Sequence, residues 1–391
     1  MRRLAILGST GSIGTSTLEV VRESGGELAV WSLAAGNNIE RLAAQVREFR
    51  PRLVSVATSD AASRLRQDLG SEAARVDILH GPAGNIAAAT ASDVDTVVSA
   101  AVGVAGLEAT YEAVVRGKRI ALANKEVLVA AGELVIEAAR VSGAELLPVD
   151  SEHNGVHQCL RAGRKNEARR LVLTASGGPF RKTPRERLTD VTPDQALRHP
   201  TWNMGPRITI NSATLMNKGF EVIEACWLFG FAPSQVEVVI HPQSSVHAMI
   251  EFADGSVVAQ VSVTDMKMPI QYALYYPDRR PCPESRRLDW GTVRQWDFEP
   301  PDREKFPALD LAYRALGMGG AAGCTLNAAD EVAVAAFLNG RISFPAMAEV
   351  VAETLSAEPS VRVNSIAEIL EVDRRARRRA AELVERRAVA V

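Results

Sequence analysis

Residues 4 to 14 read Leu-Ala-Ile-Leu-Gly-Ser-Thr-Gly-Ser-Ile-Gly. The first four residues are a short apolar run typical of a buried strand, and Leu18, Val20 and Val21 then follow a helical pattern. The stretch predicts a strand, a glycine turn and a helix. Glycines in such a turn let backbone amides approach a pyrophosphate at the positive end of the helix. The GxxGxxG spacing is a variant of the usual GxGxxG, so a plain tight turn is the alternative.

Strand and helix patterns alternate from this turn to about residue 150, which predicts an α/β fold with a Rossmann-like, doubly wound parallel sheet. The predicted strands are 28–33, 53–57, 96–100, 119–123 and 146–149, and the predicted helices are 61–69 and 106–116. Sheets of this kind bind ligands at the carboxyl ends of their strands. We therefore expect functional side chains in the turns that follow these strands.

The turn after the second predicted strand reads Ala34-Ala35-Gly36-Asn37-Asn38 and contains no acidic residue. In an NAD-binding domain, an acidic residue here would hold the ribose 2′-hydroxyl. A neutral turn with Arg41 nearby leaves room for a 2′-phosphate. The sequence therefore favours NADP over NAD.

Two carboxylates, Asp150 and Glu152, follow the strand that ends at Pro148. In extended backbone, residues i and i+2 point the same way, so both side chains would aim at one point that suits Mg²⁺ or Mn²⁺. The alternative is the start of a helix, with Asp150 or Ser151 as its N-cap. Lys125, in the turn after the preceding strand, would lie at the same edge of the sheet, unless it is an ordinary solvated lysine.

The sequence pattern changes after residue 152. A predicted strand at 171–174 is broken by Ala175-Ser176-Gly177-Gly178-Pro179-Phe180, and residues 181–207 then contain four prolines, many charges and little periodicity. A segment of this length is either disordered or a lid. Trp202 and Met204 favour a lid, because exposed apolar side chains of this size would cover a ligand.

A predicted helix carries Asn217, Lys218 and Glu221, which share one face because they are three and four residues apart. A common helical salt bridge between Lys218 and Glu221 is one interpretation. In the other, Glu221 joins Asp150 and Glu152 on the metal, while Asn217 and Lys218 hold an anion beside it.

The remaining patterns predict an antiparallel sheet and a helical end. Strands are predicted at 236–240, 246–252 and 257–263, with a hairpin at Asp254-Gly255, and His241 and His247 are expected to be structural. Helices are predicted at 308–316, 326–339, 345–355 and 365–384. The predicted domains are a nucleotide-binding domain at 1–150, a catalytic domain at 151–276 that includes the lid at 181–207, a proline-rich linker at 277–301 and an α-helical domain at 302–391.

Composition and the absence of a long apolar run predict a cytoplasmic protein of ordinary globular type. The 391 residues are 47% hydrophobic and 24% charged, with a formal charge of −2, which argues against bulk attraction to nucleic acid. The four cysteines show no metal or disulfide spacing, and no apolar run is long enough to span a membrane. A basic run at 374–379 is interleaved with later glutamates, which favours a solvated helix over a nucleic-acid contact.

Six motifs occur in a fixed order along the chain: GSTGSIG at 8–14, ANKE at 123–126, PVDSEHN at 148–154, SGGPF at 176–180, His199-Pro200 and MNKG at 216–219. In these motifs the chain resembles the 1-deoxy-D-xylulose 5-phosphate reductoisomerase family over essentially its whole length. The resemblance implies an NADP-dependent oxidoreductase of the non-mevalonate isoprenoid pathway. Such an enzyme rearranges 1-deoxy-D-xylulose 5-phosphate and reduces the product with NADPH to 2-C-methyl-D-erythritol 4-phosphate.

The resemblance also implies the site, residue by residue. The metal ligands would be Asp150, Glu152 and Glu221, which together with Lys125 are the expected catalytic residues. The substrate would be bound by Lys125, Ser151, Glu152, Ser176, His199, Trp202, Met204, Ser212, Asn217, Lys218 and Glu221. The NADPH site would be lined by Thr10, Gly11, Ser12, Ile13, Gly36, Asn37, Asn38, Asn124, Glu126 and Gly205.

The resemblance further implies NADPH and Mg²⁺ or Mn²⁺ as cofactors, with Co²⁺ as a further option, and a homodimer joined through the central sheet. The partners expected are a phosphorylated sugar substrate, with no nucleic acid and no membrane. Many relatives carry a basic residue where this chain has Asn37, which predicts a smaller preference for NADPH over NADH. Two alternatives are a metal-free NADP-dependent dehydrogenase of another small aldehyde or semialdehyde, and a non-enzymatic NADP-sensing protein.

Overall fold

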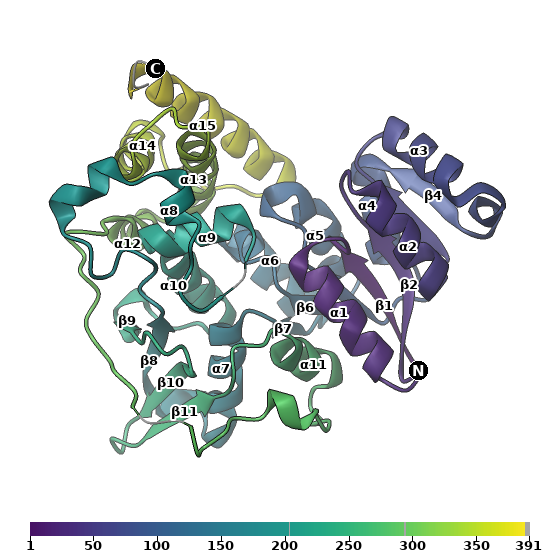
Figure 1. Cartoon of the computed structure of the whole chain (residues 1–391), viewed down its shortest axis with the longest axis horizontal. Coiled ribbons are helices and arrows are strands. Elements are labelled where there is room, and N and C mark those ends of the chain that lie inside the picture. The colour runs from purple at the N-terminus through teal and green to yellow at the C-terminus, as the bar shows by residue number, and fades with distance from the viewer. Residues whose placement is uncertain (203, 293–294, 388–391) are drawn as a thin grey trace. The chain divides into compact units, whose positions relative to one another are not determined.

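The computed structural model describes residues 1–202, 204–292 and 295–387. Figure 1 shows the whole chain, which its contacts divide into two units. Each unit has its own hydrophobic core. The first unit consists of Met1–Val127, Val135–Asn154 and Asp265–Arg286, and the second of Leu128–Leu134, Gly155–Thr264 and the chain from Arg287 onward. The predicted lid, linker and helical domain include positions 203, 293–294 and 388–391, and these parts of the predictions lie outside the described residues.

The first unit contains a parallel sheet, as predicted. Within the described residues the strand order is β4-β3-β2-β1-β5-β6-β7, and every pair is parallel. The strands are β1 (Arg2–Leu7), β2 (Leu28–Ala34), β3 (Leu53–Val56), β4 (Asp77–His80), β5 (Thr96–Ser99), β6 (Arg119–Leu122) and β7 (Leu146–Pro148). The helices are α1 (Ser12–Glu23), α2 (Ile39–Phe49), α3 (Ser59–Leu69), α4 (Gly81–Thr90), α5 (Leu107–Val115) and α11 (Lys267–Tyr275). Helix α6 (Glu126–Ser142) is shared, because its residues Leu128–Leu134 belong to the second unit.

The glycine turn lies where the strand order reverses. Strand β1 pairs with β2 on one side and with β5 on the other, and this is the position at which doubly wound sheets bind ligands. Gly8 follows β1 with φ +85°, and a Cβ atom there would lie 2.4 Å from the carbonyl oxygen of Ala100, just after β5. Only glycine fits both the backbone conformation and the space.

Helix α11 was not predicted, and it belongs to the first unit although it follows residue 264. Its side chains Ile270, Ala273 and Leu274 are fully buried in the same core as Leu147 and Val149. It packs against α1, β6 and β7. The two units thus divide the chain differently from the four predicted domains, whose boundaries remain a proposal.

The second unit contains a mixed sheet, and the predicted mostly antiparallel sheet is confirmed. Within the described residues its order is β11-β10-β8-β9, with antiparallel pairs except β8 with β9. The strands are β8 (Ala168–Ala175), β9 (Val236–Ile240), β10 (Val246–Phe252) and β11 (Val257–Val261). Gly255, with φ +85°, lies in the connection between β10 and β11, where the hairpin was predicted.

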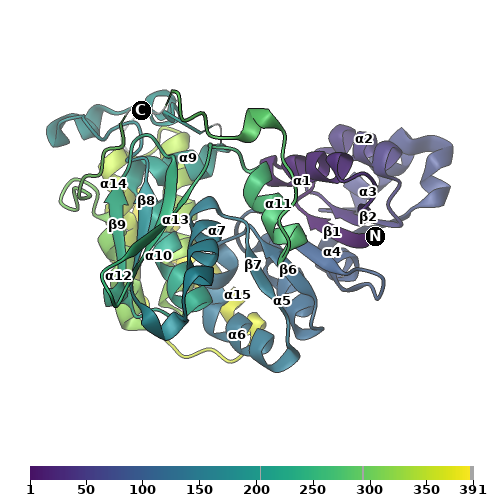
Figure 2. The same cartoon turned by 90° about the horizontal axis from the view of Figure 1, so that it is seen from below.

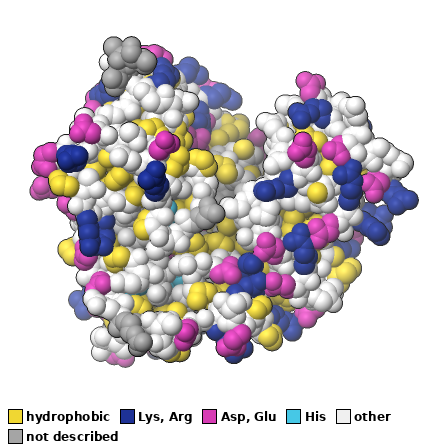
Figure 3. All heavy atoms as spheres, in the orientation of Figure 1, with side chains coloured by type: hydrophobic (Ala, Val, Ile, Leu, Met, Phe, Trp, Pro, Cys, Tyr) yellow, Lys and Arg dark blue, Asp and Glu magenta, His cyan; other side chains and the backbone are white. Residues whose placement is uncertain are grey.

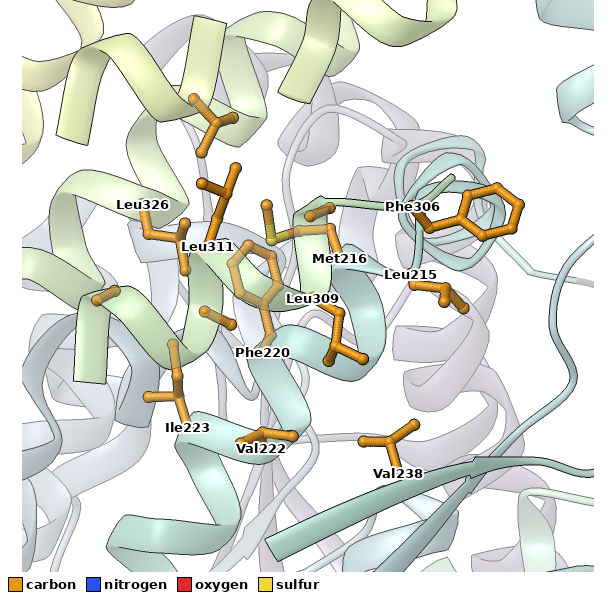
Figure 4. Close-up of a cluster of buried hydrophobic side chains, with 14 of the residues drawn as sticks. Leu215, Met216, Phe220, Val222, Ile223, Val238, Phe306, Leu309, Leu311 and Leu326 are labelled. Atoms are coloured by element: carbon orange, nitrogen blue, oxygen red, sulfur yellow. The ribbon is translucent and has the colours of Figure 1, made fainter. Parts of the chain in front are cut away.

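Helices cover this sheet and form the C-terminal region, as predicted. They are α8 (Pro193–Ala196), α9 (Pro206–Thr214), α10 (Met216–Phe229), α12 (Ala308–Met318), α13 (Ala322–Leu338), α14 (Phe344–Ala357) and α15 (Ile366–Arg387). Helix α10 lies between the sheet and α12 (Figures 1 and 2). Its Phe220, with 1% of its surface exposed, packs in a cluster with Leu309 and Leu326 (Figure 4). Burying a side chain of this size contributes about 1.5–3 kcal/mol, so this cluster fixes the position of α10.

The basic run on α15 pairs with carboxylates. Its ion pairs are Arg374 with Glu371, Arg375 with Glu358, Arg377 with Asp373 and Glu331, Arg378 with Glu371, and Arg379 with Glu382. On the face shown in Figure 3, basic and acidic side chains are likewise interspersed. Among the described residues, no helix has the length and apolar character needed to cross a membrane.

Candidate active site

Two adjacent strands of the first unit bring a lysine and a carboxylate together. Lys125 follows β6 and Asp150 follows β7, and these strands are neighbours in the sheet. The Lys125 ammonium forms an ion pair with Asp150 Oδ2, and the two side chains are only 7% and 13% exposed. The edge of the sheet therefore places both predicted catalytic groups in one largely buried pair.

The predicted extended conformation of Asp150 and Glu152 is wrong. Helix α7 (Ser151–Cys159) begins directly after Asp150, and the amide of Asn154 donates to the carbonyl oxygen of Asp150 at 2.8 Å. Pro148 ends β7, and the chain then turns into a helix, which was the alternative prediction. One carboxylate oxygen of Asp150 still lies within 4.8 Å of one of Glu152, because both residues lie at the start of α7. The two carboxylates are thus close for a different reason from the one predicted.

The same helix adds a residue that the sequence did not single out. His153 is fully buried, and its Nδ1 lies 3.9 Å from Asp150 Oδ2. The spacing of three residues from Asp150 would have indicated this contact if a helix had been assumed. Beside it, Ser151 Oγ donates to Glu152 Oε1 at 3.0 Å.

The predicted nucleotide-binding residues of the first unit lie mainly in two neighbouring turns. Thr10, Gly11, Ser12 and Ile13 form the glycine turn and the start of α1, and Gly36, Asn37 and Asn38 connect β2 to α2. The carbonyl oxygen of Ala34, at the end of β2, accepts hydrogen bonds from the amides of Gly8 at 2.8 Å and Ser9 at 2.9 Å. These bonds hold the two turns side by side at the carboxyl edge of the sheet.

The other predicted nucleotide-binding residues lie in three further places. Asn124 is buried after β6 and donates from Nδ2 to the carbonyl oxygen of Gly103 at 2.9 Å. Glu126 is the first residue of α6. Gly205 belongs to the second unit, where it is the N-cap of α9.

In the second unit, His199 links two of the residues that were predicted to bind the substrate. Its Nε2 lies 2.9 Å from Ser176 Oγ and 3.0 Å from Ser212 Oγ. Its Nδ1 accepts hydrogen bonds from the backbone amides of Thr201 at 3.2 Å and Trp202 at 2.9 Å. The acceptor role of Nδ1 places the proton of the neutral ring on Nε2. Burial lowers the pKa of His199, which favours this neutral form.

Helix α10 presents the third predicted metal ligand. Asn217 Nδ2 donates to Glu221 Oε1 at 2.6 Å, and the Lys218 ammonium forms an ion pair with Glu221 Oε2. The predicted salt bridge between Lys218 and Glu221 is therefore present. Unlike a common surface salt bridge it is buried, since the two side chains are only 5% and 0% exposed. Glu224, one helical turn further, is also fully buried, and the sequence did not single it out. Its spacing of three residues from Glu221 was the available indication.

The predicted lid is anchored in part by the core of the second unit. Leu188, Val191 and Ala196 are buried there, whereas Trp202 and Met204 near its end are half-buried. The indole ring of Trp202 lies 6.3 Å from the ring of His247, centroid to centroid. His247 and His241 were predicted to be structural; both are buried, and His247 lies beside the predicted covering side chain.

A polar network at the end of the lid was not predicted. Arg207, in the first turn of α9, donates to Asn327 Oδ1 at 2.8 Å and pairs with Glu331 Oε1 at 2.9 Å. Asn211 Nδ2, on the same helix, donates to Asp330 Oδ2 at 2.8 Å. These contacts tie α9, which carries Ser212, to α13.

The chain matches one protein family along most of its length. Three family models match the chain: 1-deoxy-D-xylulose 5-phosphate reductoisomerase at residues 4–132, its C-terminal domain at 146–229, and the DXP reductoisomerase C-terminal domain at 261–379. The 1-deoxy-D-xylulose 5-phosphate reductoisomerase of Solibacter usitatus is 61% identical over 99% of this chain and 98% of its own. The chain belongs to the 1-deoxy-D-xylulose 5-phosphate reductoisomerase family.

Other members of the reductoisomerase family agree with this assignment. The protein of Chlorobium phaeobacteroides is 50% identical over 99% of this chain and 100% of its own. The solved reductoisomerase of Zymomonas mobilis in complex with NADPH is 41% identical, covers 98% of this chain and 99% of its own, and superposes with a TM-score of 0.91. A reductoisomerase solved with NADPH, fosmidomycin and magnesium is 39% identical over 98% of both chains, with a TM-score of 0.92. The family resemblance inferred from six motifs is confirmed.

Proposed function

We propose that this chain converts 1-deoxy-D-xylulose 5-phosphate to 2-C-methyl-D-erythritol 4-phosphate, with NADPH as the reductant and a divalent cation as cofactor. The observation that supports this most is the 61% identity to a reductoisomerase over 99% of the chain. The site geometry agrees with it, because each unit presents the residues that one part of this chemistry requires.

The carboxylates Asp150, Glu152 and Glu221 are proposed to hold Mg²⁺ or Mn²⁺, with Co²⁺ as a further option. They offer hard oxygen ligands, and the closeness of Asp150 and Glu152 in the first unit fits a shared cation. The cation, when bound, supplies Lewis acidity to the adjacent carbonyl and hydroxyl oxygens of the substrate. Glu221 is buried without exposure, so it offers its charge in a site from which bulk water is excluded.

Lys125 is proposed to neutralise the negative charge that develops on the substrate's oxygens. Its ammonium is held at the sheet edge by Asp150, so its position is set before substrate arrives. Ser151 and Glu152, at the start of α7, would contact the same end of the substrate. Migration of a carbon–carbon bond then yields a branched aldehyde, and the same lysine remains in place for its reduction.

The substrate phosphate is proposed to bind in the second unit. Ser176, Ser212 and the Nε2–H of His199 form a ready set of hydrogen-bond donors, since His199 already lies between the two hydroxyls. Asn217 and Lys218 on α10 would add an amide and a positive charge. Anchoring the phosphate would hold the far end of the substrate, so that rearrangement and reduction take place in one site.

NADPH is proposed to bind along the glycine turn of the first unit, and it supplies the hydride that reduces the aldehyde. The turn fits a pyrophosphate, because Gly11 is exposed and lies at the N-terminus of α1. Side chains at Gly8 and Gly14 would each collide with backbone at 2.4 Å, so the tight path of the turn depends on them. Asn124 and Glu126, which follow β6 at the same edge of the sheet, would contact the nicotinamide half.

The test of this function is NADPH oxidation by the purified protein with 1-deoxy-D-xylulose 5-phosphate, in a titration of Mg²⁺ or Mn²⁺. We expect turnover that requires the cation. Turnover unaffected by removing all divalent metal would instead favour a metal-free dehydrogenase. A synthetic branched aldehyde phosphate should also be reduced, and its rejection during normal turnover of the xylulose phosphate would contradict the proposed order of steps.

Lys125→Ala is expected to impair both the full reaction and the reduction of the aldehyde, by about 10²–10³-fold in kcat, because it removes a preorganised charge. Lys165→Ala is the matched control, since Lys165 is exposed in the second unit. A normal rate of aldehyde reduction by Lys125→Ala would show that the lysine acts only in the rearrangement.

The segment 181–207 is proposed to act as a lid, with Trp202 as the covering side chain. Closure would exclude water from the reacting groups. Its protease sensitivity should fall when NADPH and a substrate analogue are added together. Unchanged cleavage within this segment would contradict a lid.

The chain is further proposed to work as a cytoplasmic homodimer joined through the mixed sheet of the second unit. Strand β11 is at the edge of that sheet, and its Val257 is 54% exposed, which suits a surface that another copy covers. Light scattering of the purified protein should give twice the mass of the chain. Val257→Lys should shift that mass towards the monomer, and a monomeric wild type would refute the proposal.

A further inference from the structure

Helix α2 is tied to the glycine turn by two of its side chains. Gln45 Nε2 donates to the carbonyl oxygen of Ser9 at 2.9 Å, and Arg41 Nη1 donates to the carbonyl oxygen of Thr10 at 3.0 Å. Arg41 and Gln45 are four residues apart, so they share the face of α2 that points at the turn. The guanidinium is therefore held at the carboxyl edge of the sheet, between the glycine turn and the turn after β2.

The turn after β2 has no negative charge of its own. Gly36, Asn37 and Asn38 are all exposed, and Asn38 is occupied in capping α2 by accepting the amide of Arg41 at 3.2 Å. In dinucleotide-binding sheets this turn contacts the adenosine ribose. An acidic residue that would favour a free 2′-hydroxyl is missing from this turn.

Arg41 differs from the neighbouring arginines of the same layer in its partners. Arg22 pairs with Glu48, and Arg47 pairs with Asp68 and Glu72. Among the residues that the structure describes, no carboxylate lies within ion-pair distance of Arg41, and its one recorded side-chain bond is to a neutral carbonyl. Arg41 is also exposed. Its charge is thus uncompensated, and a guanidinium has five N–H donors, enough to bind an oxyanion while keeping the bond to Thr10.

We propose that Arg41 recognises the 2′-phosphate of NADPH in this chain. The turn has open space, since nothing lies within 4 Å of a Cβ atom built on Gly36, and the N-terminus of α2 adds a favourable dipole. This inference rests on the proposed function, because it assumes that NADPH binds along the glycine turn. It makes Arg41 the residue that sets the cofactor preference.

The test compares the binding of 2′,5′-ADP and 5′-AMP to the full-length protein by calorimetry, because these probes differ only in the 2′-phosphate. We expect the wild type to bind 2′,5′-ADP more tightly. Arg41→Ala should lower that preference by about 10- to 100-fold, as expected for loss of a charge-assisted hydrogen-bond pair, and leave the affinity for 5′-AMP unchanged. Arg41→Lys should be intermediate, since an ammonium lacks the planar fork.

Arg47→Ala is the matched control, because Arg47 is on the same helix and its exposed ion pairs lie away from the turn. Asn37→Lys in the Arg41→Ala background should restore the preference for 2′,5′-ADP. If Arg41→Ala still preferred 2′,5′-ADP as strongly as the wild type, the inference would be wrong. Arg41 would then only hold α2 against the glycine turn. Absence of any preference in the wild type would overturn it as well.

These outcomes are separate from those of the proposed function. If Arg41→Ala abolishes the preference but no variant turns over the xylulose phosphate, the inference stands and the proposed reaction is wrong. If NADPH is oxidised in the proposed reaction and Arg41→Ala keeps the preference, only the inference fails.

Discussion

Asp330 on α13 offers the sharpest test of how the C-terminal helices support the phosphate site. Its carboxylate accepts the amide of Asn211 at 2.8 Å and lies 3.8 Å from the guanidinium of Arg207. Asp330 and Asn211 are each only 4% exposed. Asp330→Ala would leave a buried amide without its acceptor and weaken the pairing of a largely buried arginine.

The expected cost follows from these contacts. Removing one partner of a buried pair costs about 3–5 kcal/mol, and a hydrogen bond to a charged group contributes about 1.5–3 kcal/mol. Arg207 keeps Glu331 at 2.9 Å and Asn327 at 2.8 Å, so the lower end of the range applies. We expect a loss of about 3 kcal/mol, which lowers the Tm of a unit of this size by about 6–12 °C.

The assay is differential scanning calorimetry, together with the KM for the phosphorylated substrate. KM should rise, because loosening α9 displaces the Ser212 hydroxyl that follows Asn211 in the chain. Asp330→Asn is the matched control, since its amide oxygen can still accept from Asn211, and it should cost about 1 kcal/mol. If both variants lowered Tm equally and by less than 2 °C, the buried acceptor would not be what holds α9.

Three further predictions concern the site itself. Glu221→Gln should raise the concentration of Mn²⁺ needed for half-maximal turnover at least about tenfold, and an unchanged metal titration would remove α10 from the metal site. Burial lowers the pKa of His199, so its ring should be neutral above pH 6.5 and accept the backbone amides of Thr201 and Trp202. As pH falls through the lowered pKa, the ring gains a proton and should lose these two hydrogen bonds. Acrylamide quenching of tryptophan emission should therefore rise on acidification in the wild type and not in Trp202→Phe. Gly8→Ala should lower the free energy of unfolding by at least about 1–2 kcal/mol, measured in urea, because φ is +85° and a Cβ would meet a carbonyl oxygen at 2.4 Å. Gly36→Ala, with open space around its Cβ, is the control and should be close to neutral.

The parts of the fold that could be predicted are those that local sequence patterns determine. The apolar run before Gly8 and the repeated alternation after it indicate a parallel sheet, because each strand and helix has its own period. The meeting of Lys125 and Asp150 also follows from the sequence, since both come at the carboxyl ends of predicted strands. Topology then makes those strands neighbours.

The parts that could not be predicted depend on longer-range contacts or on competition between local signals. The residues around Asp150 are compatible with an extended turn or with the start of a helix, and the structure contains the helix. Strand β4 was missed because only Ile78 of its four residues is buried, so it shows no apolar run. The bond between Asn211 and Asp330 joins residues 119 positions apart, and no periodic pattern reports such a contact.

Helix α11 has a consequence for anyone who wishes to dissect this protein. A gene fragment that ends at residue 154 would contain every strand of the parallel sheet but lack the helix whose Ile270 and Leu274 complete its core. Such a fragment would expose Leu147 on β7 and Val149 just after it, in the segment that leads to Asp150. A usable nucleotide-binding module therefore has to be assembled from two distant pieces of the gene, with residues 265–286 joined to the end of the first piece through a flexible connection. In this family member, the smallest unit that can be exchanged between relatives is discontinuous in the DNA.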